Sequence, residues 1–400
     1  MITRHRRIAV AVAVAATALV GSVTAPSPAG ATEPDLPYFQ ETTGAAVAHP
    51  GDANPIVGHF TDPVFDDILW YEAGPAKEQL WTPCSGCGGG PFTKTQLPLA
   101  NQVGGYYQPL VGDFAGSSLD DIYWLSGSSA ADYLWTSNGT GSFTVKRFDA
   151  PGGEVYPLLL PDSRSGPGKD DILWISGFES ALSRLWVFPD DGSGIARTKG
   201  RMRVPEGRAV VGDYDGNGAA DILFYPHTTN CRCPTPAAAT STDWLWRRSS
   251  SQASSFTMTS MNIKGEYAPV VGRFSGQGDD RDDILWVGQY SVCCSAPEDR
   301  PDSLWEGRAN GGFTASTQSF PSAGGGIVLE HDGADTVLVF AQTESNVWFD
   351  TTSGPVLRPV GSQLPYYDFP IVGRFTTADR EDLYRLGYSG HPDTLYHPFF

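Results

Sequence analysis

The hydrophobic residues of this chain recur in short runs that are separated by turn-forming residues. Between residues 55 and 71, for example, the run PIVGHF is followed by the loop segment TDPVF and then by a second run, DDILWY. Runs of this length that are rich in branched and aromatic residues and bounded by Gly, Pro and Asp predict β-strands. The chain also holds 46 Gly and 31 Pro among 400 residues, which disfavours long helices.

The pair of runs is one unit of an internal repeat. Seven copies of it begin near Pro55, Pro109, Pro157, Ala209, Pro269, Gly326 and Pro370. A Leu-Trp, Val-Trp or Leu-Tyr pair follows each copy, and a Phe-Thr segment such as SFTVKRF follows most of them. Each unit of about fifty residues therefore predicts four short strands.

Four strands in each of seven units predict an all-β fold, a seven-bladed β-propeller of four-stranded blades. Residues 32–400 then form a single domain, with the repeated Pro-led run as the innermost strand. The chain ends before a fourth strand of the last unit, so we expect residues 37–47 to supply that strand and close the ring.

Tryptophan and aspartate recur at fixed places in the repeat. Ten of the 11 Trp lie in the second and third strands, where packing between blades is the leading interpretation and sugar stacking the alternative. An acid opens most second strands, and its repetition favours capping of a turn over the acid pair of a glycosidase. These closing acids are Asp67, Asp121, Asp171, Asp283 and Asp382.

The first residues have the form of a secretory signal peptide. Basic residues up to Arg7 precede an apolar run over residues 8–20 and a small-residue stretch that ends at Ala31. We therefore predict cleavage after residue 31 and an extracellular protein, an uncleaved anchor being the alternative. No other stretch of the sequence is apolar enough to predict a membrane span.

Six cysteines occur as three close pairs. An even number in a secreted chain predicts disulfides, while a four-thiolate zinc site is the alternative. The connectivity stays open, because neighbouring cysteines close only small strained rings. The disulfide candidates are Cys84, Cys87, Cys231, Cys233, Cys293 and Cys294.

The formal charge of −18 limits the partners that the protein can have. Without residues 1–31 the chain keeps 24 basic and 45 acidic side chains, a charge of −21. Such a surface disfavours nucleic acids and anionic membranes. We expect a monomer.

The recurring VGDF and DDILW segments resemble the FG-GAP or VCBS repeats of integrin-α-like propellers, over nearly the whole mature chain. That resemblance implies a calcium loop of the form DxDGxGxxD between the first two strands of a blade. The segment 213–221 matches it fully, and its spacing suits the six to eight oxygen ligands that calcium prefers. The expected ligands of one Ca²⁺ are Asp213, Asp215, Asn217, Ala219 (through its carbonyl) and Asp221. A metal-free Asx turn is the alternative.

A second candidate site is the face on which the inner strands begin. Tyrosine, Asn and Arg there suit a neutral glycan or a peptide, although these tyrosines could instead fill gaps between blades. The candidates are Asn54, Tyr107, Tyr156, Arg208, Tyr267 and Tyr367.

No catalytic motif is recognisable in the sequence, so whether the protein is an enzyme stays open, with a non-catalytic role favoured. The sequence favours a secreted, calcium-stabilised binding or adhesion module for an extracellular glycan or protein. The alternatives are a secreted polysaccharide lyase or glycoside hydrolase acting on the same face, and a structural envelope protein.

Overall fold

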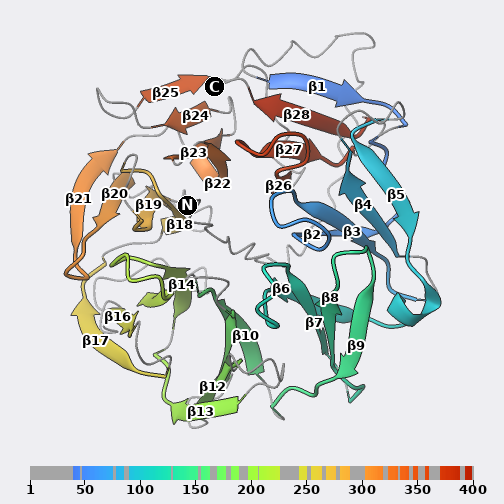
Figure 1. The fold of residues 1–400 in the computed structure, drawn as a ribbon. Helices are drawn as coiled ribbons and strands as arrows, with labels where there is room; N and C mark the ends of the chain where they lie inside the picture. The colour runs from blue at the N-terminus through green and yellow to red at the C-terminus, as the bar shows by residue number, and fades with distance from the viewer. Residues whose placement is uncertain are drawn as a thin grey trace, which may run out of the picture.

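The structure is a computed structural model, and it shows a ring of antiparallel sheets (Figure 1). It describes residues 39–45, 47–74, 78–84, 90–127, 129–151, 155–162, 169–176, 182–188, 197–205, 207–225, 243–249, 254–263, 267–275, 280–288, 302–318, 323–331, 334–341, 346–349, 356–359, 370–387 and 392–398. The predicted signal peptide, Tyr367 and five of the six cysteines lie outside these residues. Cys84, the cysteine within them, is disulfide-bonded.

The described strands form seven four-stranded sheets, which we call blades one to seven in chain order. Blades one to three consist of β2 (Asn54–Gly58), β3 (Asp67–Tyr71), β4 (Gln79–Pro83) and β5 (Phe92–Gln96); β6 (Tyr107–Gly112), β7 (Asp121–Ser126), β8 (Tyr133–Ser137) and β9 (Phe143–Arg147); and β10 (Val155–Leu160), β11 (Asp171–Ser176), β12 (Ser183–Val187) and β13 (Arg197–Met202). The short 3-10 helix η1 (Leu99–Asn101) lies between blades one and two.

Blades four to seven continue the same order along the chain. They consist of β14 (Arg208–Gly212), β15 (Asp221–Tyr225), β16 (Asp243–Arg248) and β17 (Phe256–Met261); β18 (Tyr267–Gly272), β19 (Asp283–Gly288), β20 (Asp302–Gly307) and β21 (Phe313–Gln318); β22 (Ala323–His331), β23 (Ala334–Ala341), β24 (Asn346–Phe349) and β25 (Val356–Pro359); and β26 (Ile371–Gly373), β27 (Asp382–Arg385) and β28 (Thr394–Pro398) with the N-terminal β1 (Phe39–Thr43).

The strand order in each blade runs from the centre of the ring to its outside, so the prediction of an all-β propeller is confirmed (Figure 1). The predicted closing strand is also present: β1 pairs antiparallel with β28, Phe39 opposite Pro398 and Thr43 opposite Thr394. The ring is therefore closed by pairing the N-terminal strand with the last strand of the chain.

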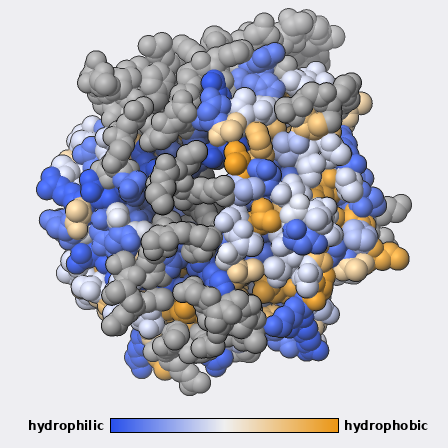
Figure 2. Space-filling model, in the orientation of Figure 1, coloured by the Kyte–Doolittle hydropathy of each residue, from blue (hydrophilic) through white to orange (hydrophobic). Residues whose placement is uncertain are grey.

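Aromatic side chains fill the space between and within the blades. Trp70 and Trp124 are each 1% exposed, and each packs against the Trp of the next strand at 5.1 and 5.2 Å between ring centroids. Tyr71 of blade one and Trp124 of blade two contact across the interface at 5.0 Å. The interpretation of these tryptophans as packing residues is confirmed. On the part of the surface visible in Figure 2, orange hydrophobic residues are interspersed with blue and white ones.

Glycine ends most inner strands because the neighbouring blade comes too close for a side chain. A Cβ atom on Gly58 would lie 2.9 Å from Val111 of blade two, and one on Gly112 would lie 2.8 Å from Asp170 of blade three. Both distances are shorter than a carbon atom tolerates, so the inner strands pack around the centre of the ring with no room for a larger residue.

Candidate functional site

The ends of the inner strands carry a repeated contact between blades, which we call the clasp. In the clasp of blades one and two, the N–H of His59 donates to Asp120 Oδ2 at 2.8 Å, and the N–H of Asp120 donates back to the His59 carbonyl at 2.9 Å. Five further interfaces have the same pair of bonds, at 2.7–3.1 Å. They join Asp113 to Asp170, Asp213 to Asp282, Arg273 to Asp335, Glu330 to Glu381 and Arg374 to Asp66.

The interface between blades three and four lacks the carboxylate of the clasp. Pro161 stands where the other blades have a backbone N–H to donate, and Ala220 stands where they have the accepting acid. The remaining bond, from the N–H of Ala220 to the Pro161 carbonyl, is kept at 3.2 Å. Donor and acceptor are thus missing together, which avoids an unsatisfied buried polar group. A fully buried ion pair between Arg248 of blade four and Asp171 of blade three crosses the same interface.

The acid that opens the second strand in six of the seven blades caps loops within its own blade. Asp121 accepts from the N–H of Ala115 at 2.7 Å and from that of Ser137 at 2.9 Å. Asp67, Asp171, Asp221, Asp283 and Asp382 accept backbone N–H groups in the same way. The predicted turn-capping role of these acids is confirmed.

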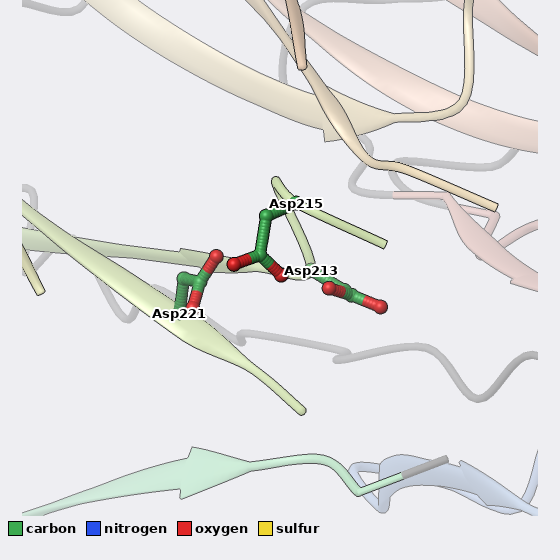
Figure 3. Close-up of side chains that lie close together, drawn as sticks. All are labelled: Asp213, Asp215 and Asp221. Atoms are coloured by element: carbon green, nitrogen blue, oxygen red, sulfur yellow. The ribbon is translucent and has the colours of Figure 1, made fainter. Parts of the chain in front are cut away.

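The loop 213–221 of blade four brings the three predicted acidic calcium ligands together. One carboxylate oxygen from each of Asp213, Asp215 and Asp221 lies within 4.8 Å of the others. Asp213 and Asp215 follow β14 and Asp221 begins β15, so the loop returns the chain to the same place (Figure 3). The carboxylate of Asp213 also accepts from the N–H groups of Asn217 and Gly218 at 3.0 and 2.7 Å, which holds the loop tightly around it.

The charges of these acids are incompletely balanced by the protein. Burial, together with the neighbouring carboxylates, raises the pKa of Asp213 to about 6 and that of Asp221 to about 8. Burial also raises the pKa of Asp215, although Arg247 acts in the opposite direction. A divalent cation would relieve this repulsion, and carboxylate oxygens are the hard ligands that calcium prefers. The residues present therefore fit a calcium ion, with Asn217 beside them as a further oxygen donor.

The equivalent loop of blade two, residues 113–121, has similar backbone angles but different side chains at the positions of the candidate metal ligands. Gly116 and Gly216 have φ of 74° and 73°, while Ser118 and Gly218 have φ of 69° and 83°. Asp113 is likewise enclosed by the N–H groups of Gly116, Ser117 and Ser118 at 2.6, 3.0 and 3.0 Å. Ala115 and Ser117 replace the second acid and the asparagine, so the tight loop forms without the set of ligands.

The other predicted face lies where the inner strands begin. In register, Asn54, Gln108, Tyr156 and Arg208 occupy the same position of blades one to four, opposite Tyr71, Leu125, Ile175 and Tyr225. We call these four residues the start rim. Asn54 and Gln108 are exposed, Tyr156 is 63% exposed and Arg208 is half-buried.

Two predicted ligand residues pack between blades. The ring of Tyr107 lies 6.5 Å from Trp124 and 6.3 Å from Tyr133, and its hydroxyl donates to the Ala131 carbonyl at 3.2 Å. Tyr267 lies 5.7 Å from Trp286. The sequence held a signal for this difference, because Tyr107 and Tyr267 stand two residues before the repeated proline and Tyr156 stands one before it. Alternate residues of one strand face opposite sides of a blade. The exposed tyrosine of this loop is the neighbouring Tyr106, which is 88% exposed.

Histidines near acids have a structural explanation. His59 lies between Asp66 and Asp120, at 3.5 and 3.3 Å, but both acids also accept the N–H groups of a clasp. His397 Nδ1 contacts Asp382 Oδ1 at 3.0 Å in blade seven, where Pro398 lacks the N–H that Ser137 gives to Asp121 in blade two. In both clusters the carboxylates accept backbone N–H groups, so a structural role accounts for their position.

Comparison with known proteins supports the fold and gives no family. No family model and no curated protein matches the chain, so the resemblance to FG-GAP repeats stays an interpretation. Among solved structures, a lectin of Agrocybe aegerita that recognises non-reducing terminal N-acetylglucosamine has a TM-score of 0.53 at 14% identity, over 84% of this chain and 85% of the lectin. The polysaccharide lyase Uly1 is more distant, with a TM-score of 0.47 at 12% identity over 83% and 87% of the two chains.

Within the described residues, no helix has the length and apolar character that crossing a membrane requires.

Proposed function

We propose that this protein is a secreted carbohydrate-binding β-propeller that binds a glycan on its start rim and one calcium ion in the loop of blade four. The observation that carries the proposal is the start rim itself. Four successive blades present Asn54, Gln108, Tyr156 and Arg208 at one register position, without an acid among them. An amide, an exposed aromatic ring and a guanidinium together can stack on a sugar and bond its hydroxyl groups.

The lectin that shares the fold supports the choice of a sugar as the first ligand to test. It is described as recognising terminal N-acetylglucosamine, an uncharged sugar. Because propellers serve many functions, the likeness bears on which ligands to test first and leaves the function itself to experiment. The formal charge of −18 also favours an uncharged glycan over an acidic one.

Calcium has a supporting role in this proposal. The loop 213–221 lies between the first two strands of blade four, at the opposite end of the inner strand from Arg208. A cation there is therefore expected to stabilise the fold rather than to contact the sugar. Removal of calcium should therefore weaken glycan binding only under conditions in which it also unfolds the protein.

An array of neutral and acidic oligosaccharides, probed with the mature protein in calcium and in EGTA, tests the function. We expect binding to neutral sugars in both conditions at a temperature where the protein stays folded. Binding to none of the sugars, together with release of reducing ends from a polysaccharide, would replace the proposal with the lyase or hydrolase. Capture of a protein ligand only would replace the glycan with a protein partner.

A further inference from the structure

Tyr71 fixes the backbone on both sides of Tyr106, which among the described aromatic residues near the start rim is the most exposed. Its hydroxyl donates to the Gly105 carbonyl at 2.6 Å and accepts from the N–H of Tyr107 at 2.9 Å. These two groups belong to the peptide bonds before and after Tyr106. One buried hydroxyl therefore restrains both peptide planes of Tyr106, while the side chain of Tyr106 is 88% exposed.

Tyr71 is itself held firmly. It is 5% exposed at the end of β3, and its ring lies 5.0 Å from Trp124 of the next blade. Burial raises the pKa of Tyr71, so the hydroxyl keeps the proton that it donates to Gly105. The loop before β6 is thus attached to a side chain that cannot move without disturbing the interface of blades one and two.

The register of β6 separates the two tyrosines of this loop. Tyr107 begins β6, and its ring packs against Trp124 and Tyr133 of its own blade, beside the core shared by blades one and two. Tyr106 precedes it and is exposed, so it adds little to packing. A rigid backbone beneath an exposed ring lowers the entropy that is lost when a ligand stacks on the ring.

We propose that Tyr106 is an aromatic stacking residue for an uncharged pyranose, and that Tyr71 is the residue that positions it. The inference rests on the proposed function, because it adds Tyr106 to the glycan surface of the start rim. Sugars present one face made of C–H groups, and a tyrosine ring held flat against that face adds contact area at low entropic cost.

Blade four offers a matched control for this role. Tyr225 ends β15 as Tyr71 ends β3, and its hydroxyl donates to the Tyr267 carbonyl at 2.7 Å and accepts from the Tyr267 N–H at 3.1 Å. Its ring also packs against a tryptophan of the next blade, Trp286, at 5.2 Å. Tyr225→Phe therefore removes an equivalent pair of hydrogen bonds, but those bonds restrain the packed Tyr267 and leave Tyr106 untouched.

The experiment compares Tyr106→Ala, Tyr71→Phe and Tyr225→Phe with the wild type on an array of chito-, cello-, xylo- and manno-oligosaccharides. Affinity for the best-bound oligosaccharide is then measured by calorimetry, and thermal melting is measured for every variant. We expect Tyr106→Ala to weaken binding at least tenfold and Tyr71→Phe to weaken it about three- to tenfold. Tyr225→Phe should bind as the wild type does, with a fall in melting temperature similar to that of Tyr71→Phe.

Several outcomes would overturn the inference. If Tyr106→Ala binds as the wild type does while Tyr156→Ala loses binding, the proposed function stands and the role of Tyr106 is wrong. If Tyr106→Ala loses binding but Tyr71→Phe matches Tyr225→Phe, Tyr71 does not position the ring. A wild-type protein that binds none of the four sugar classes would overturn the proposed function, and the stacking role with it.

Hydrogen exchange tests the positioning by Tyr71 without any sugar. The amide of Tyr107 should exchange at least tenfold faster in Tyr71→Phe than in the wild type, because its acceptor is removed. The same amide should be unchanged in Tyr225→Phe. Equal exchange in Tyr71→Phe and the wild type would show that the hydroxyl does not restrain this loop.

Discussion

The two ends of the inner strands differ in what their residues do. At the ends of six of the seven inner strands, acids accept backbone N–H groups of the neighbouring blade, as Asp120 does for His59. At the start, Asn54, Gln108 and Tyr156 are exposed, and a hydroxyl of the blade before restrains the loop at Tyr106. The clasps hold the ring together at one end, which leaves side chains at the other end available for a ligand.

The largest effect on stability is expected from the buried ion pair where the clasp is incomplete. Arg248→Ala leaves Asp171 buried without its guanidinium partner, which should cost about 3–5 kcal/mol of unfolding free energy. Arg247→Ala, at the adjacent position of β16, is the matched control and should cost less than about 1 kcal/mol. Urea unfolding measures both, and equal losses would show that the pair adds nothing specific at this interface.

The clasp itself can be broken or wrongly completed. Asp120→Ala removes the charged acceptor of the His59 N–H and should cost about 2–3 kcal/mol in urea unfolding. Ala220→Asp restores the acid at the interface of blades three and four, but Pro161 has no N–H to donate to it. We therefore expect Ala220→Asp to destabilise the protein as well. A gain in stability would mean that the missing donor does not explain the missing acid.

Calcium should stabilise the same end of the ring. At a free concentration a hundred times the dissociation constant, a ligand that binds only the folded state adds about 2.7 kcal/mol. Addition of EGTA should therefore lower the melting temperature of the wild type and leave that of Asp215→Ala unchanged. Ser117→Ala, in the equivalent loop of blade two, is the control and should keep the full calcium effect. A wild type insensitive to EGTA would contradict the calcium site.

Alkaline pH should weaken the clasp of blades one and two. Burial disfavours the charged form of His59, and the nearby Arg374 acts in the same direction. The carboxylates of Asp66 and Asp120 outweigh both effects and raise the pKa of His59 to about 9. Because this folded-state pKa is above the unfolded value of about 6.5, the stabilisation is complete below pH 6.5 and is lost as the pH rises through 9. When the pH rises from 7 to 10, the unfolding free energy of His59→Gln should fall by about 1–2 kcal/mol less than that of the wild type. Parallel pH profiles would contradict this role of His59.

Repetition made the fold predictable from the sequence, and the match of residues 213–221 to a single motif predicted the cluster of Asp213, Asp215 and Asp221. The Asp-Ile-Leu-Trp segment and its variants predicted the second strand of each blade. The last repeat lacks a fourth strand, which predicted that β1 pairs with β28. The clasps were not predictable, because the acid before Asp121 looks the same whether it faces solvent or the next blade. Tyr106 and Tyr107 are adjacent and identical, and only the register of β6 decides which ring is buried.

The smallest effect on stability, and the most direct test of the start rim as a glycan site, is expected from Tyr156→Ala. The side chain is 63% exposed, so its removal should change the unfolding free energy by less than about 0.5 kcal/mol. Calorimetric titration with the neutral oligosaccharide that the wild type binds best on the array should show affinity at least tenfold lower for Tyr156→Ala, which is about 1.4 kcal/mol. Unchanged affinity in a variant of unchanged stability would contradict the claim that this protein binds glycans on its start rim.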